Sequence, residues 1–485
     1  MSLRQNARAA GIYAGAKFAS YGVNLLVLPI LTRLLTPADF GVIALAWLFP
    51  AVAVSVFTCG LSASAQRYYF EYRNDPQKLH AFFITSQFFL FASLAVFAAL
   101  IWPLQNLLAK LIMANPAYGR ALYWAAIASY LSQIVNFYSI QWQNMERPGL
   151  AAGVPLVQAV LTTALGLCFV LSGQRDYMGP IYGALISPAL VCCIACWHFN
   201  RGTTGRFNLS ILRENIAFGL QVVPKSFSSF IPRFFDKYML NNILSLDAVG
   251  IYNIGQSLGN SMSILMNTVW SALQPVCYRE VFDNRETGAR EAGKLFTVFA
   301  YLALLPVLGG ALFAPELMTV IAPPSYHAAI DVTIVILAGM ATQTFGMYCG
   351  VQFAYAKKAY WIFPLTAVGT LANVAGNMLM IPRLGLLGAA ASVAAMMAVS
   401  NGALTTVAQR VYPLGYQWLR LVLIHGTVIA AAAFVVTARR LEAAWPVIYF
   451  GKLVFLGLYG AVGAGCGVIT RERIDRLMQM ALAKP

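Results

Sequence analysis

The sequence predicts an all-α polytopic membrane protein with about fourteen transmembrane helices. Hydrophobic residues make up 59% of its 485 residues and charged residues only 10%, whereas soluble domains carry about 25% charged residues. Apolar stretches of the length that crosses a bilayer, about 20 residues, follow one another along the chain. The segments between them are too short for a soluble catalytic domain, so the soluble function classes are excluded.

The expected spans follow from hydropathy alone, and two of them are unusually polar. They cover residues 11–32, 42–64, 80–102, 119–141, 151–172, 178–198, 217–241, 249–276, 295–321, 329–354, 360–381, 386–408, 418–437 and 445–469. Span 217–241 carries charges, and span 249–276 carries several Asn and Gln side chains. Both are therefore expected to face a water-filled cavity.

The basic residues predict the orientation of the chain. With both termini placed in the cytoplasm, the inner loops and tails hold about three times as many Lys and Arg residues as the outer loops. This bias predicts an even number of spans with both ends inside. The net charge of +16 then reflects topology and contact with anionic lipid, and not nucleic-acid binding.

The sequence offers no catalytic constellation, and its CxxC, formed by Cys193 and Cys196, has no second ligand pair that would indicate a metal or redox site. Most of the eight cysteines lie in or beside apolar spans, which suits small hydrophobic residues better than disulfides. The four histidines lack metal-ligand spacing, and no GxxxxGK[ST] phosphate-binding loop is present. We therefore expect a protein that is not an enzyme and that uses no cofactor or metal.

Two pairs of segments indicate an internal repeat. TPADFGVIALA (36–46) matches SLDAVGIYNIG (245–255), and GPIYGALIS (179–187) matches GLLGAAAS (385–392), at similar offsets. The repeat predicts two six-helix lobes in parallel orientation, related by an axis along the membrane normal. The predicted parts are an N-terminal lobe at 1–200, a C-terminal lobe at 210–412, two appended helices at 416–470 and a cytoplasmic tail at 471–485.

Charged residues inside spans are the candidate functional residues, because each costs about 2.5–3.5 kcal/mol at the bilayer centre. The repeat places Lys17 one residue from the equivalent of Lys225. Our hypothesis is that these two lysines face each other across one cationic cavity, which would suit an anionic cargo. Snorkelling to the membrane surface is the alternative for Lys17.

Further polar residues extend this candidate cavity. Arg233 is a third candidate for the cationic cavity, and Asp236 is either an ion-coupling residue or the partner of Arg233 in a structural ion pair. Asn253, Gln256 and Asn260 could contact sugar hydroxyls, with ordinary interhelical hydrogen bonds as the alternative.

Four more charged residues are expected to be peripheral. Lys237 is expected to snorkel to the outer surface, and Lys452, in an appended helix, to snorkel or contact lipid. Glu316 and Asp331 are the other acids considered for proton or sodium coupling, but exposure at the interface is the simpler interpretation, since both lie near span ends.

Four motifs carry a family resemblance. ILTRLLTPADFGVIAL (30–45), GLSASAQRYYFEY (60–72), FDKYMLNNILSLDAVGIYNI (235–254) and NVAGNMLMIPRLGLLGAAAS (373–392) resemble the bacterial polysaccharide transporter, or oligosaccharide flippase, family. This Wzx-type family belongs to the multidrug/oligosaccharidyl-lipid/polysaccharide exporter superfamily.

The resemblance implies twelve core helices, often with two appended, and transport by alternating access between two lobes. The implied cargo is a polyprenyl-diphosphate-linked oligosaccharide, moved from the cytoplasmic to the outer leaflet of the bacterial inner membrane for O-antigen, capsule or exopolysaccharide synthesis. Implied partners are membrane lipids, H+ or Na+ as coupling ions, and polysaccharide polymerase or export machinery. A cation-coupled multidrug exporter of the same superfamily is the alternative.

Overall fold

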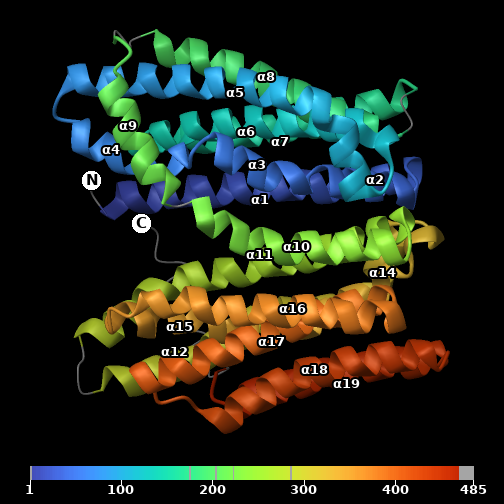
Figure 1. The fold of residues 1–485 in the computed structure, drawn as a ribbon. Helices are drawn as coiled ribbons and strands as arrows, with labels where there is room; N and C mark the ends of the chain where they lie inside the picture. Colours follow the sequence, from blue (N-terminus) through green and yellow to red (C-terminus); the bar gives the residue numbers. More distant parts are fainter. Residues whose placement is uncertain (1–2, 174–175, 202–204, 222, 284–286, 469–485) are drawn as a thin grey trace. The chain divides into compact units, whose positions relative to one another are not determined.

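The structure is a computed structural model that describes residues 3–173, 176–201, 205–221, 223–283 and 287–468. Within these ranges the side chains of residues 3–10, 13–14 and 225–229 are not described. All secondary structure in the described residues is helical, and the predicted fold class is confirmed. The long helices of each part run alongside one another (Figure 1).

Eleven helical segments of the described residues have the length and composition of membrane spans. They are Gly15–Leu34, Pro37–Tyr72, Pro76–Met113, Pro148–Leu171, Met178–Asn200, Gly288–Leu312, Ala329–Tyr355, Ala359–Leu384, Leu386–Val411, Trp418–Arg440 and Trp445–Gly465. Each coincides with one of the predicted spans. The chain is a multi-pass membrane protein.

The other three predicted spans are also helices, but their composition is too polar for them to be counted as spans. They are α6 (Gly119–Asn144), α10 (Val223–Ile243) and α11 (Leu246–Asp283). The last two are the spans whose charges and amides set them apart in the sequence. A polar helix of this length in a membrane protein has to place its polar side chains against other helices or water.

One helix was not expected from the sequence. Helix α9 (Leu209–Leu220) occupies a stretch that was divided between a loop and the start of span 217–241. Asn208 caps it, because its side chain accepts hydrogen bonds from the Ser210 and Ile211 amides at 2.9 and 3.3 Å. The capping residue was the signal in the sequence that marked this helix. Unlike its neighbours, α9 runs across the other helices of its part (Figure 1).

By its internal contacts the chain divides into two compact units, residues 1–250 and 251–485. The predicted lobe boundaries at 200 and 210 remain a prediction, and the tail 471–485 lies outside the described residues. The first unit contains, besides α6, α9 and α10, these helices: α1 (Leu3–Leu34), α2 (Pro37–Ala46), α3 (Leu48–Phe57), α4 (Leu61–Tyr72), α5 (Pro76–Met113), α7 (Pro148–Leu171) and α8 (Met178–Asn200).

The second unit contains most of α11 and the remaining helices. These are α12 (Gly288–Leu312), α13 (Ala314–Ile321), α14 (Ala329–Met340), α15 (Gln343–Tyr355), α16 (Ile362–Leu384), α17 (Leu386–Val411), α18 (Trp418–Arg440) and α19 (Trp445–Gly465). Its core is aromatic: Phe296, Phe299 and Tyr348 are fully buried, and the Tyr348 hydroxyl donates a 2.5 Å hydrogen bond to the Ala292 carbonyl.

Both copies of the second repeat motif lie at close helix contacts. The α7–α8 and α16–α17 pairs make the most extensive helix contacts of the described residues, and each contains one copy of this motif. In the first pair, a Cβ atom on Gly183 would overlap the backbone of Gly166. In the second, a Cβ atom on Gly388 would overlap the backbone of Met380. Small residues thus let both helix pairs approach closely.

The two copies of the first motif contact each other reciprocally. A Cβ atom on Gly41 would meet the Leu246 carbonyl, and a Cβ atom on Gly250 would meet the Pro37 carbonyl. Gly41 and Gly250 are repeat equivalents, as are Pro37 and Leu246.

We expect Gly250→Ala to destabilise the protein by about 1–3 kcal/mol, the usual cost of overpacking. The added methyl group has no room, because the neighbouring atoms belong to backbone and not to a flexible side chain. The measurement is the thermal unfolding midpoint in detergent. Gly153→Ala in α7, where an added Cβ atom would have no neighbour within 4 Å, is the matched control; equal midpoints for the two variants would contradict the prediction.

Candidate functional site

Lys17 opens onto a cavity of about 510 Å³ in the first unit. The cavity lies between α1, α6 and α7, and its lining residues are Ala16, Lys17, Ser20, Tyr21, Asn24, Gln143, Ala152 and Pro155. The four polar residues from α1 follow an i, i+3, i+4, i+7 spacing, so they share one face of the helix. The first transmembrane helix therefore presents a polar stripe to this cavity.

Two neutral members of the stripe, Ser20 and Asn24, are held by hydrogen bonds; the Ser20 hydroxyl donates to the Ala16 carbonyl at 2.9 Å. Asn24 donates to the Ser20 carbonyl at 3.0 Å and accepts from the Thr163 hydroxyl of α7 at 3.4 Å. The Lys17 side chain is exposed, like those of Tyr21 and Asn24, and it forms no ion pair with an acid among the described residues. A cation in these surroundings is able to bind an anion through its three N–H donors.

The other predicted residues of the first unit lie on α10, and none of them lines this cavity. Arg233 is exposed and Asp236 is buried. The side chain of Lys225 lies outside the described residues, so the pairing of Lys17 with Lys225 stays a prediction. One expectation is wrong: Lys237 is 8% exposed and does not extend to the surface, because α10 is packed by neighbours on the face that carries it.

In the second unit, helix α11 carries the three amides predicted to contact sugar. Gly255 and Gly259 form its packed face, since Cβ atoms there would meet Val332 and Ile336 of α14. At about 100° per residue, Asn253, Gln256 and Asn260 lie within about 60° of one another, on a side turned about 80–140° away from this packed face. All three are at least partly exposed, so α11 also has one packed apolar face and one accessible polar face.

Sequence reasoning named Lys17 as a candidate but did not name the residues that line the same cavity. Ser20, Tyr21 and Asn24 could have been found, because their spacing from Lys17 is that of one helical face. Gln143 could not have been found in this way, because it comes from α6, far away in the chain. The helical period identifies a face but not the helix that lies opposite it.

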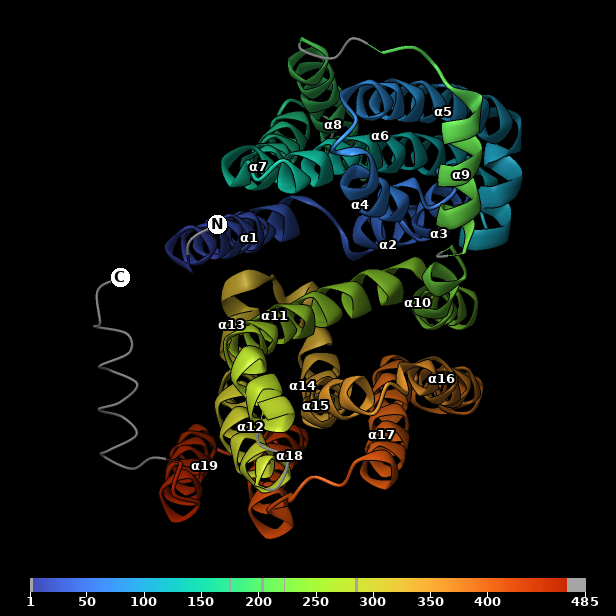
Figure 2. The ribbon, with the colours of Figure 1, turned by 90° about the vertical axis from the view of Figure 1, so that its left-hand side faces the viewer.

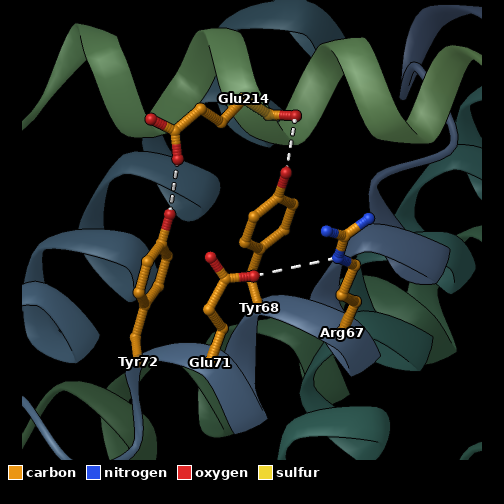
Figure 3. A network of polar contacts seen from close by, with 5 residues as sticks. All are labelled: Arg67, Tyr68, Glu71, Tyr72 and Glu214. Carbon is orange, nitrogen blue, oxygen red and sulfur yellow. Dashed lines mark hydrogen bonds and ion pairs between the residues drawn. The ribbon is translucent and has the colours of Figure 1, made fainter.

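A network of polar contacts fastens α9 to α4 (Figure 3). The Tyr72 hydroxyl donates to the Glu214 carboxylate at 2.8 Å, and the Tyr68 hydroxyl donates to the Glu214 carbonyl at 3.2 Å. Arg67 stacks its guanidinium 4.8 Å from the ring of Phe218. Arg67 also forms a 3.8 Å ion pair with Glu71. Both side chains are about half exposed, so this pair contributes little to the stability of the fold.

We expect Tyr72→Phe and Glu214→Ala to be non-additive, with a coupling of about 1 kcal/mol, since each removes the same charged hydrogen bond. The measurement is a double-mutant cycle on the thermal unfolding of the purified protein. Tyr68→Phe combined with Glu214→Ala is the control, because Tyr68 donates to the backbone carbonyl, which alanine keeps. Equal coupling in both cycles would show that the carboxylate is not the acceptor.

Comparison with known proteins gives one family match and several similar folds. Residues 7–281 match the family model described as polysaccharide biosynthesis protein. A structure of the lipid II flippase MurJ in an inward closed conformation is 10% identical, with 93% of this chain and 98% of that chain covered and a TM-score of 0.72. None of the curated proteins matches the chain.

Two further solved structures share the fold. The MATE multidrug transporter DinF-BH is 14% identical, with 84% and 96% of the two chains covered and a TM-score of 0.59. A MOP superfamily transporter from Pyrococcus furiosus is 15% identical, with 86% and 96% covered and a TM-score of 0.53. At these identities the similarity shows the fold alone, and identifies neither a function nor a substrate.

Proposed function

The chain belongs to the polysaccharide biosynthesis protein family, as its sequence motifs indicated, and we propose that it is a flippase for polyprenyl-diphosphate-linked oligosaccharides. The proposed reaction moves the cargo from the cytoplasmic to the outer leaflet of the bacterial inner membrane by alternating access. In this proposal both termini lie on the cytoplasmic side of the membrane. The observation that carries the proposal is the exposed Lys17 on the polar face of α1, in a cavity without an acidic lining residue.

The charge of this cavity favours an anionic cargo. At the pH of a cell, lysine is a point charge suited to phosphate oxygens, and the cavity's other polar residues are uncharged. A multidrug exporter that takes up cations would need acidic side chains here. This difference favours the flippase over the cation-coupled multidrug exporter, which has the same fold.

The two polar faces suit different parts of the cargo. We assign the diphosphate to Lys17, with Lys225 and Arg233 as further cationic contacts. The amides of Asn253, Gln256 and Asn260 both donate and accept hydrogen bonds, which matches sugar hydroxyls. Asp236 is either a coupling residue for H+ or Na+ or a structural partner of Arg233.

The lipid tail needs no polar surface, because it can stay in the hydrocarbon while the head group moves. The transported glycan would then serve O-antigen, capsule or exopolysaccharide synthesis, together with polymerase or export machinery. The MurJ structure of similar fold belongs to a protein that flips lipid II. That likeness supports a lipid-linked substrate class but not a particular glycan.

The test measures the leaflet distribution of lipid-linked oligosaccharide in cells depleted of this protein, with a membrane-impermeant reagent that labels sugars. We expect the precursor to accumulate on the cytoplasmic side, and wild type but not the Lys17→Ala/Lys225→Ala double variant to reverse this. An unchanged distribution together with increased sensitivity to cationic drugs would contradict the flippase and favour the exporter.

A further inference from the structure

A second, separate cavity of about 330 Å³ lies in the second unit, at the end where α12 and α18 begin and α19 ends. Helices α12 and α18 lie side by side there (Figure 2). The lining residues are Lys294, Thr297, Val298, Gln417, Arg420, Cys466, Gly467 and Val468. None of them belongs to the polar faces assigned to the transported cargo.

The polar groups of this cavity are held in place by one another. The Gln417 side-chain oxygen accepts hydrogen bonds from the Thr297 hydroxyl at 3.1 Å and from the Arg420 guanidinium at 3.0 Å. The loop before α18 is fixed to α12, because the Gly415 amide donates to the Ala289 carbonyl at 3.0 Å. Thr297 is only 1% exposed. The walls of the cavity are therefore held in place by packing and hydrogen bonds between helices.

The cavity has three sources of positive potential. Lys294 and Arg420 supply two cations, and Lys294 is partly neutralised by Glu291, which lies 2.6 Å from it. Gln417 is the N-cap of α18, yet its side chain makes no capping hydrogen bond, so it leaves the first amides of the helix available. A helix start with free N–H groups favours anions.

Apolar side chains beside the cavity indicate the source of the anion. Trp418, Leu419 and Val422 on α18 are 53%, 75% and 63% exposed. On a helix of a membrane protein such side chains face acyl chains, and Trp prefers the interface between head groups and hydrocarbon. A soluble anion would gain nothing from these residues, whereas a phospholipid could place its phosphate in the cavity and its acyl chains along α18.

We propose that this cavity binds the phosphate of an anionic phospholipid through Lys294, Arg420 and the first amides of α18. Basic pockets between transmembrane helices bind anionic lipid head groups in general. The site would hold a resident lipid against the two appended helices and the core of the second unit. It does not depend on the identity of the transported cargo.

The test compares thermal unfolding of the purified full chain in detergent with added phosphatidylglycerol, phosphatidylcholine or inorganic phosphate. We expect only phosphatidylglycerol to raise the midpoint, and the Lys294→Gln/Arg420→Gln double variant to bind it at least about tenfold more weakly. Lys78→Gln, a cation variant at the start of α5, is the control and should respond like wild type.

Native mass spectrometry of the same proteins gives a second readout that does not depend on stability. Wild type should retain one more phosphatidylglycerol molecule than the double variant. The Arg420→Lys protein should carry this additional lipid on most of its molecules. Equal retention by wild type and the double variant would overturn the site. Equal stabilisation by inorganic phosphate would overturn the assignment to lipid.

Discussion

Replacement of Lys17 by alanine is expected to reduce transport by about ten- to a hundredfold, and Lys17→Glu to abolish it. Hydrogen bonds to charged groups contribute about 1.5–3 kcal/mol, and Lys17 is the one cation among the residues that line the cavity. Alanine removes the attraction to the diphosphate, whereas glutamate adds repulsion. Lys17→Arg should restore most of the rate, because it keeps the charge.

The measurement is the rate at which lipid-linked oligosaccharide becomes accessible to the impermeant label, normalised to the amount of folded protein in the membrane. Lys110→Ala is the matched control. Lys110 is an exposed lysine in the last turn of α5, in the same unit, and lines none of the cavities described above. A Lys17→Ala protein that flips at the rate of Lys110→Ala would contradict the role of Lys17 in binding the head group.

The sequence carried most of the information about the fold, because the membrane constrains it so strongly. Most spanning segments are helices of about 20 predominantly apolar residues, and hydropathy locates such segments. Helices α10 and α11 stood out in the sequence because they carry polar residues within predicted spans. The same polar residues make them candidates for a functional role. Helix α9 was missed, because it is short and lies across the other helices.

The sequence carried less information about the polar contacts. The stripe on α1 was accessible through helical periodicity, but Gln143 reaches the same cavity from a different helix. Glu316 and Asp331 were expected to be exposed at the interface, yet both form ion pairs with the appended helices. Hydropathy measures the cost of a charge in the membrane, but it cannot identify a partner more than a hundred residues away.

Lys452 is the clearest correction. It was expected to snorkel or to contact lipid, but it is 1% exposed and paired with Glu316 of α13. Its ammonium group also lies 5.2 Å from the ring of Phe313 and 4.9 Å from that of Tyr449. Lys452 therefore joins α19 to the core of the second unit, and it is unsuitable as a neutral control for Lys17.

We expect Lys452→Ala to be among the most destabilising single substitutions in the chain. Removing one partner of a buried ion pair costs about 3–5 kcal/mol, because the other charge is left uncompensated. The lower end of this range applies here, since the Glu316 side chain is 35% exposed. The expected result is a lower thermal unfolding midpoint in detergent, with less protein recovered from the membrane.

The double variant Lys452→Met/Glu316→Gln distinguishes the loss of the ion pair from the cost of leaving one buried charge unpaired. It removes both charges and keeps similar volumes, so its midpoint should lie above that of Lys452→Ala. The Arg439–Asp331 pair is the matched comparison. Arg439 is 29% exposed, whereas Lys452 is 1% exposed, so Arg439→Ala removes a much less buried side chain and should cost less than Lys452→Ala. A double variant less stable than the single one would contradict a role for charge pairing.

The same double variant decides whether Glu316 couples transport to an ion gradient. A carboxylate that carries H+ or Na+ must bind and release it during each cycle, which a permanent salt bridge to Lys452 opposes. We therefore expect Lys452→Met/Glu316→Gln to flip its cargo at close to the wild-type rate per folded molecule. If transport were lost while the protein remained folded, Glu316 would be a coupling residue, and Lys452 would be the cation that controls its charge.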